Sequence, residues 1–462
     1  MDGTICGWCQ KQAYFTKKAR IKIFKAKNEE ARVHFIPTLK DGVFVTLCAP
    51  LVINKSCGLD IHKRFVIATI LSRSGEKQQH RFARDDDGIL DLKNLVTSEK
   101  CDVVACESTS DFWVPIYEAL IDHLPVIVGN ARDMKAFTHK KTDKIDSEVI
   151  AKLALNKMVQ PSRVFPKKHR EFRSYVRLRL TLVRKRTDIK NEAHAILSSE
   201  MLHLGDVLTD IFGKNGRAIL AGISSGKNID QIIESLSPNV RKKSVQIREI
   251  LDREISQSAA IRLQICLNLI KHLDEEIEVL EREIFNYAYQ KHKREMEILM
   301  SVPGIGELGA ATLIAEIGDF RDFPTGDKLA SWLGIVPNVY QSADKYHNGR
   351  ITKRGSKVAR WILTQIAQAA ARKKNSRLKE FFNRKKKTIG YAKAIIALAR
   401  KIATIIWHLI TNDEMYEDET GYQKGEVKKR KIVEADIFSV DERITIISGI
   451  IAIMGKKEGE ST

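Results

Sequence analysis

The feature that most constrains the fold is an apolar repeat between residues 259 and 287. Its members follow one another in alternating steps of four and three residues: Ala259, Leu263, Cys266, Ile270, Leu273, Ile277, Leu280, Ile284 and Tyr287. This spacing continues for four heptads, so it predicts one long helix that pairs along a narrow apolar seam as a coiled coil. The predicted partner is the stretch Arg170–Leu197 of the same chain or a second protomer. An ordinary long helix in a bundle is the alternative.

Residues 56–160 read as an α/β unit. Short apolar runs predict strands at Ser56–Ile61, Arg64–Ser72, Lys77–Ala83, Asp102–Glu107 and Pro125–Val128, and helices at Ile89–Leu95 and Phe112–Ile121. The order is a hairpin-like first half followed by a β-α-β segment, which predicts a mixed sheet covered by helices.

Four acidic residues are expected to meet at one edge of this sheet. Asp60 and Glu107 each end a predicted strand, at the edge where open α/β sheets bind ligands. Asp143 and Asp146 lie three residues apart at the start of a helix that Thr142 can cap. Carboxylate-rich sites suit Mg²⁺, and two such ions about 4 Å apart can promote phosphodiester chemistry. Taken alone, the helix pair is more typical of a cap and a solvated face.

The charge of the chain predicts a polyanionic partner. It has 78 Lys and Arg against 58 Asp and Glu, a formal net charge of +20 and a pI of about 9.5. Nucleic acid is the expected partner, and a membrane surface is the competing one. We see no run of about 18 uncharged apolar residues, so we expect no membrane-spanning helix. Met1–Gln10 lacks the pattern of a secretion signal, and we expect a cytoplasmic protein.

Two segments are candidates for contact with nucleic acid. A basic helical stretch, Arg163–Lys190, places Arg170, Arg173 and Arg177 on a predicted binding face. Further on, Gly304 and Gly306 interrupt a helical pattern in the manner of a helix-hairpin-helix turn. The backbone N–H groups of such a turn can contact phosphate without reading sequence. A simple connection between two helices is the alternative.

Ser356 is a second candidate for the chemistry. It stands at a predicted helix start among four basic residues, Lys353, Arg354, Lys357 and Arg360. The simpler interpretation is an N-cap serine within a DNA-binding surface. The other interpretation is a nucleophile, because a phosphate held at the helix start would lie beside the hydroxyl.

Four segments together resemble one known family. They are Gly58-Leu-Asp60-Ile-His-Lys63, Cys106-Glu107-Ser-Thr109, Lys141-Thr-Asp143-Lys-Ile-Asp146 and Arg350-Ile-Thr-Lys-Arg-Gly-Ser356. In order and spacing, from about residue 56 to residue 410, the chain resembles the DEDD-type insertion-sequence transposases, which are relatives of the Piv DNA invertase.

The resemblance implies a specific machinery. It implies a RuvC-like nuclease-fold domain, a coiled-coil linker and a C-terminal transposase domain, with Mg²⁺ held by Asp60, Glu107, Asp143 and Asp146. It also implies that Ser356 forms a covalent phosphoserine link to DNA. A structured bridge RNA is implied as guide, pairing with donor and target DNA. A homo-oligomer is implied too, a dimer or tetramer, in which the acids of one protomer meet the serine of another.

We therefore expect five segments. They are an N-terminal extension of unknown role (1–54), a RuvC-like catalytic domain (55–160), a basic helical and coiled-coil linker (161–298), a transposase domain (299–412) and a tail (413–462). The expected function is a transposase that cleaves and exchanges DNA strands. The alternatives are a junction-resolving endonuclease without a covalent intermediate and a non-enzymatic nucleic-acid-binding protein.

Overall fold

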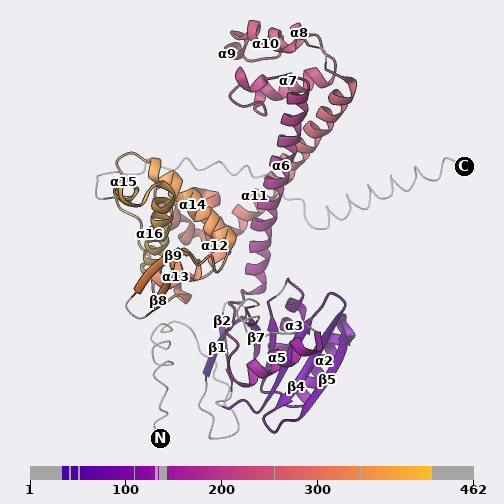
Figure 1. Ribbon diagram of the computed structural model, residues 1–462, viewed down its shortest axis with the longest axis vertical. Coiled ribbons are helices and arrows are strands. Elements are labelled where there is room, and N and C mark those ends of the chain that lie inside the picture. Colours follow the sequence, from indigo (N-terminus) through magenta and orange to yellow (C-terminus); the bar gives the residue numbers. More distant parts are fainter. Residues whose placement is uncertain are drawn as a thin grey trace, which may run out of the picture. The chain divides into compact units, whose positions relative to one another are not determined.

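The computed structural model describes residues 34–40, 43–49, 52–108, 110–130, 134, 143–253, 255–342 and 345–418 (Figure 1). For residues 34–40, 43–49, 143–145, 339–342 and 345–348 only the backbone is described. The chain divides into two compact units. One comprises Met1–Lys291 with Ala311–Asp319, and the other His292–Ala310 with Phe320–Thr462.

A five-stranded mixed sheet forms the base of the first unit. The strands are β3 (Lys55–Ile61), β4 (Phe65–Ser72), β5 (Lys77–Ala83), β6 (Val103–Glu107) and β7 (Val126–Gly129). Their order is β5-β4-β3-β6-β7, with β3, β6 and β7 parallel and the β3-β4-β5 pairs antiparallel. The predicted strands and the mixed sheet are confirmed. Upstream, β1 (His34–Lys40) and β2 (Val43–Ala49) form a separate antiparallel hairpin within the predicted extension.

Helices cover both faces of this sheet. α2 (Asp86–Ser98) and α3 (Trp113–Leu120) bury Leu92 and Ile116 with Leu59 and Cys106 on one face. α5 (Asp143–Leu155) packs on the other face, where its apolar residues join Val103, Ala105 and Ile127. Because successive strand residues point to opposite faces, each buried strand supplies both cores.

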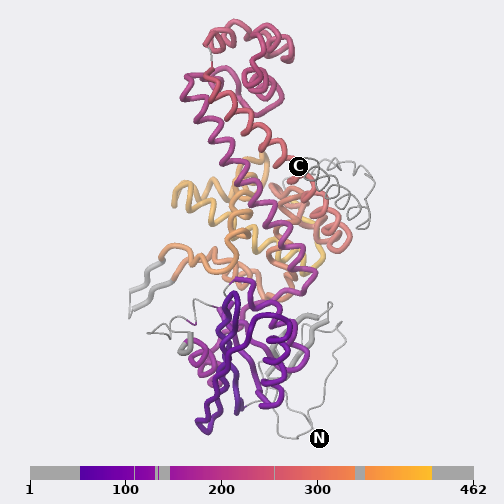
Figure 2. The backbone as a smooth tube through the Cα atoms, turned by 90° about the vertical axis from the view of Figure 1, so that its right-hand side faces the viewer, coloured from indigo at the N-terminus to yellow at the C-terminus, as the bar shows by residue number. Residues whose placement is uncertain are grey.

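Two long helices continue the first unit. α6 (Lys167–Ser199) runs antiparallel to α11 (Gln257–Ser301), and the tube in Figure 2 shows the two side by side. Residues early in α6 contact residues late in α11, and residues late in α6 contact residues early in α11. The contacts are Phe172–Tyr287 (ring centroids 4.5 Å apart), Arg179–Glu281 (2.7 Å), Arg186–Asp274 (2.5 Å) and Glu192–Arg262 (3.2 Å). The predicted long helix is confirmed, and its partner is the stretch of the same chain. α11 loses helical geometry at His292.

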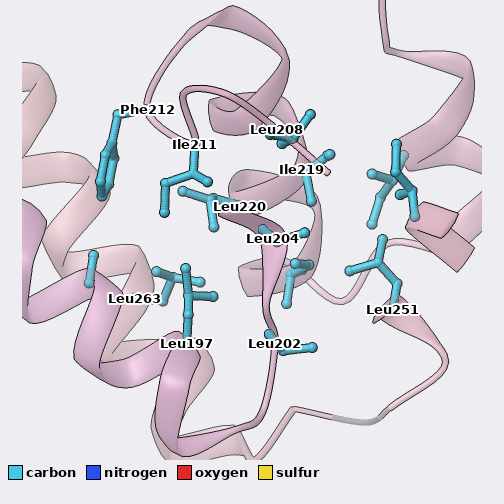
Figure 3. Packing of buried hydrophobic residues seen from close by; sticks show 14 of the residues in the cluster. Leu197, Leu202, Leu204, Leu208, Ile211, Phe212, Ile219, Leu220, Leu251 and Leu263 are labelled. Carbon is cyan, nitrogen blue, oxygen red and sulfur yellow. The ribbon is translucent and has the colours of Figure 1, made fainter. Parts of the chain in front are cut away.

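A small helical cap closes the far end of this pair. It contains η2 (Leu204–Asp206), α7 (Lys214–Ser224), α8 (Ile229–Glu234), α9 (Pro238–Arg241) and α10 (Ser244–Leu251). Figure 3 shows Leu197 of α6 and Leu263 of α11 packed against Leu204, Leu220 and their apolar neighbours. The first heptad residues are therefore buried by this cap as well as by α6.

In the part that the structure describes, the second unit is helical apart from one hairpin. After the end of α11 come α12 (Glu307–Ile317), η3 (Phe320–Asp322), α13 (Gly326–Trp332), the hairpin β8 (Pro337–Ser342) and β9 (Lys345–Ile351), α14 (Lys357–Arg372), α15 (Arg377–Ile389) and α16 (Tyr391–Asn412). α12 begins in this unit, and its part from Ala311 belongs to the first. α16 packs against α13, α14 and α15.

α16 is, within the described residues, the one helix long and apolar enough to span a membrane by length and composition. Its apolar stripe, from Ala394 to Ile410, is buried among the other helices of the unit. That burial accounts for its hydrophobicity as a core helix. The start of the predicted tail also packs here, since Asp413 pairs with Arg294 at 2.7 Å and Tyr416 N–H donates to Ser301 Oγ at 2.9 Å.

Candidate active site

Asp60 and Glu107 lie side by side at the carboxyl ends of two neighbouring strands. Leu59 of β3 is paired with Cys106 of β6, so the next residues in the same parallel register are Asp60 and Glu107. Parallel neighbours are about 4.8 Å apart across a sheet. Since Leu59 and Cys106 point into the α2–α3 core, the two acids point to the opposite face, which α5 covers.

The start of α5 is brought to the same place by close packing on β3. A Cβ on Gly58 would lie only 2.2 Å from the Ser147 carbonyl oxygen and 2.3 Å from the Ala151 nitrogen, so only glycine admits this approach. Ser147 Oγ lies 2.8 Å from Thr69 Oγ1, and Ser56 Oγ donates to the Ala151 carbonyl at 2.8 Å. These bonds fix the helix lengthwise along the strand.

This packing predicts where Asp143 and Asp146 of α5 lie along the direction of strand β3. Four helical residues, slightly more than one turn, rise about 6 Å, and two strand residues advance about 6.6 Å. Since Ser147 lies over Gly58, one turn earlier corresponds to two strand residues later, and Asp143 comes level with Asp60. Asp146, next to Ser147, is partly buried. The side chain of Asp143 and the predicted cap Thr142 lie outside the described residues.

His62 is a neighbour of the site that the sequence analysis did not single out. Its Nε2 lies 2.9 Å from Asp60 Oδ2, and its ring stacks on Phe65 with centroids 4.5 Å apart. Arg81 in turn lies over the Phe65 ring at 4.1 Å. His62 therefore orients one oxygen of Asp60, and the stacked ring limits the movement of the imidazole. The signal in the sequence was its position two residues after an acid at a strand end.

The oxygen atoms of Asp60 and Glu107 are the kind of ligand that suits a hard divalent ion. Among the described side chains, no group of three or more His, Cys, Asp or Glu lies close enough to hold an ion. Asp60 and Glu107 supply carboxylate oxygens, the ligands that Mg²⁺ prefers. The amino end of α5 carries partial positive charge, which favours carboxylates beside it before any ion binds.

Ser356 is the N-cap of α14. Its Oγ accepts from the Ala359 N–H at 3.1 Å, and the residue is buried. The loop before it adopts left-handed backbone at Lys353 (φ 54°) and Gly355 (φ 74°). A Cβ on Gly355 would lie 2.0 Å from the Trp332 carbonyl oxygen, so the loop is pressed against the end of α13. The predicted N-cap position of Ser356 is confirmed.

Of the four basic residues around Ser356, three are exposed: Lys353, Arg354 and Lys357. Arg360 turns back on the loop and donates from Nη1 to the carbonyls of Leu333 (3.1 Å), Arg354 (2.5 Å) and Gly355 (3.0 Å). Burial lowers the pKa of Arg360 from its usual range. Arg360 thus holds the loop in place, and the other three present charge to solvent.

The two glycines of the predicted hairpin turn differ. Gly304 has φ 93°, and a Cβ there would lie 2.7 Å from the Ala370 nitrogen of α14, so this residue serves close packing. Gly306 is exposed, and no atom lies within 4 Å of where its Cβ would be. Its carbonyl accepts from the Ala310 N–H at 2.9 Å, at the start of α12. Gly306 is therefore the glycine whose backbone a ligand can approach.

The three α6 arginines predicted to contact nucleic acid have acidic partners within the first unit. Arg173 and Arg177 both bind Glu316 of α12, a carboxylate with 0% side-chain exposure, through bonds of 2.8–3.1 Å. Arg170 pairs with Glu118 of α3. Their guanidinium groups thus stabilise the fold, a role that sequence analysis missed because Glu316 lies about 140 residues away.

Comparison with known proteins matches both halves of the chain. Residues 57–201 match the family model for the DEDD transposase of the IS110 type, and residues 296–383 match the model "Transposase IS116/IS110/IS902 family". A "Probable family 20 transposase" of Pseudomonas aeruginosa is 27% identical over 60% of this chain and 74% of its own length.

Two further relatives have related names. The "Transposase for insertion sequence element IS1111A" of Coxiella burnetii is 25% identical over 60% of this chain and 68% of its own. The "Pilin gene-inverting protein" of Moraxella bovis is 26% identical over 32% and 47%.

The mixed sheet with acids at its carboxyl edge and the two matched models define the class as a DNA strand-transfer enzyme. The chain belongs to the IS110/IS116 family of DEDD-type insertion-sequence transposases.

Proposed function

We propose that this transposase cuts and rejoins DNA with a magnesium site at Asp60, Glu107, Asp143 and Asp146 and with Ser356 as nucleophile. The observation that carries the proposal is the juxtaposition of Asp60 and Glu107 on adjacent parallel strands, with the start of α5 at the same level. The sheet order is consistent with a RuvC-like domain for residues 55–160.

The four carboxylates would hold the metal, and His62 would orient Asp60. Two bound Mg²⁺ ions would supply Lewis acidity to the attacking and leaving oxygens of a phosphodiester. The protein's part is to keep the acids at one level, through the contact of Gly58 with α5 and the hydroxyl bonds of Ser56 and Thr69.

Ser356 would attack the scissile phosphate. A bond forms between Oγ and phosphorus, the bond from phosphorus to one deoxyribose oxygen breaks, and that oxygen leaves with a proton. Attack by a deoxyribose hydroxyl of another strand reverses the step and restores the serine. Support comes from its place at the amino end of α14, where N–H groups and the exposed Lys353, Arg354 and Lys357 can hold a phosphate.

Further parts of the proposal rest on charge and resemblance. Gly306 would offer its backbone to phosphate as part of a helix-hairpin-helix in the 299–412 domain, and Gly304 would shape that turn. The contribution of α6 to nucleic-acid binding would be mainly indirect: the ion pairs of Arg170, Arg173 and Arg177 would hold this helix in position. We extend the proposal to a bridge RNA, to a cytoplasmic dimer or tetramer, and to a coiled-coil role for the linker 161–298. The net charge of +20 supports a nucleic-acid partner.

The test distinguishes the proposed nucleophilic role of Ser356 from its role as the N-cap of α14. Ser356→Asn keeps an N-cap acceptor and removes the hydroxyl. It is expected to abolish excision and the covalent protein–DNA adduct while the protein stays folded. Ser376→Ala, which removes the matching N-cap of α15, is the control for lost capping. Recombination by Ser356→Asn at the wild-type rate would reject the nucleophile.

A junction-resolving endonuclease without a covalent intermediate is the second candidate. The observation that favours it is the burial of Ser356 and the engagement of its Oγ by Ala359 N–H. In that case Ser356→Asn still cleaves DNA, and only Asp60→Asn and Glu107→Gln abolish cleavage.

A further inference from the structure

The four basic residues at the carboxyl end of α15 differ from several arginines of α6, because the described residues give them no acidic partner. Arg384, Lys385, Lys386 and Lys387 are exposed, and the structure gives them no ion pair among its described residues. On α6, by contrast, Arg173, Arg177, Arg179 and Arg186 each bind a carboxylate. Four adjacent, uncompensated cations repel one another, so this surface gains from a polyanion.

The carboxyl end of α15 is also exposed to solvent on every side. Every residue from Asn383 to Gly390 is exposed, although successive helical residues point in directions about 100° apart. Four consecutive cations therefore surround this last turn and a half instead of lining one face. A helix end with this distribution can follow a backbone of phosphates from several sides.

A fixed aromatic ring stands beside these cations. Gly390, with φ 78°, turns the chain sharply, and Tyr391 opens α16 with 53% of its surface exposed. The ring packs edge-on against the buried Phe382, with centroids 5.6 Å apart and planes at 86°. Lys386 Nζ lies 5.9 Å from the centre of the Tyr391 ring. The tyrosine is thus anchored at one edge and still open to solvent.

We infer that the end of α15 and Tyr391 form a binding site for single-stranded nucleic acid. Arg384, Lys385 and Lys387 bind successive phosphates, and an unpaired base stacks on Tyr391. Cations beside an exposed aromatic ring are the combination that binds unpaired strands without reading sequence, because every base has a face to stack. Strand exchange requires strands to separate, so such a strand exists during the reaction. The inference needs neither the metal site nor the role of Ser356.

The test is binding by the full chain, measured by fluorescence anisotropy. One sequence is offered as single-stranded DNA, single-stranded RNA and duplex DNA. The variant Arg384→Gln/Lys385→Gln/Lys387→Gln is compared with Lys214→Gln/Lys227→Gln/Lys242→Gln, which removes three exposed charges from the helical cap. Tyr391→Ala is compared with Tyr391→Phe. Thermal melting confirms that each variant is folded.

The α15 triple variant is expected to bind single strands on the order of tenfold more weakly than the control triple, with a salt slope smaller by about 2. Tyr391→Ala is expected to bind single strands about 5- to 150-fold more weakly than wild type, with an unchanged salt dependence of binding. Tyr391→Phe is expected to retain the wild-type affinity. An effect on either DNA or RNA single strands supports the site. The proposed site would be overturned if the two triple variants lost the same affinity for single strands. It would also be overturned if Tyr391→Ala weakened duplex binding as much as single-strand binding.

Discussion

Replacing Gly58 by alanine is expected to damage the active site without touching any acid. The new Cβ would lie 2.2 Å from the Ser147 carbonyl oxygen and 2.3 Å from the Ala151 nitrogen, whereas real Cβ contacts do not fall below 3.0 Å. Because both atoms are backbone, α5 as a whole has to move away from β3. Overpacking of this kind costs about 1–3 kcal/mol of unfolding free energy.

The displacement matters more for catalysis than for stability. A shift of α5 approaching 1 Å moves Asp143 and Asp146 away from Asp60 and Glu107, and misplacements of that size cost about 100-fold in rate. The assays are urea denaturation and single-turnover DNA cleavage. Gly205→Ala is the control, since no atom lies within 4 Å of the new Cβ. A Gly58→Ala protein with wild-type stability and cleavage rate would refute the packing argument.

Three further predictions concern other residues. Glu316→Ala should lower the unfolding free energy by about 1.5–3 kcal/mol, because two partly buried arginines of α6 lose their hydrogen bonds to a carboxylate; unchanged urea denaturation would contradict this. Burial raises the pKa of the Cys106 thiol from 9.0 to about 12, so its contribution to stability is complete below pH 9 and is lost as the pH rises towards 12. Wild type should therefore lose unfolding free energy faster than Cys106→Ala over that range, and parallel curves would argue against it. His62→Ala should weaken Mg²⁺ binding about 10- to 100-fold in calorimetry, because Asp60 loses the 2.9 Å bond that orients it; equal affinity would show that the bond does not orient a ligand.

The sheet could be predicted from the sequence because its signals are local. Runs such as Phe65–Ser72 are β-branched and bounded by polar turns, and the structure has a strand there. The long helix at residues 259–287 was equally clear from its heptad spacing. The position of Asp60 and Glu107 at the carboxyl ends of two strands was likewise expected, and these strands are parallel neighbours in the sheet.

Contacts between distant segments could not be predicted in this way. Nothing near Arg173 in the sequence indicates that Glu316 will be its partner, so the ion pairs of this basic helix were not predicted. Gly58 did carry a signal, because a glycine inside a buried strand often marks the close approach of another backbone. The cap role of Ser356 was predictable from its position, whereas its chemistry depends on DNA.

The most direct test of the central claim is Mn²⁺ binding, measured by electron paramagnetic resonance. Wild type is compared with Asp60→Asn, Glu107→Gln and Asp143→Asn, which alter three separate segments of the chain. If these segments share one metal site, each substitution alone removes the tightly bound ion, while Asp91→Asn on the exposed side of α2 leaves it unchanged. Three variants that bind Mn²⁺ as tightly as wild type would contradict the shared site.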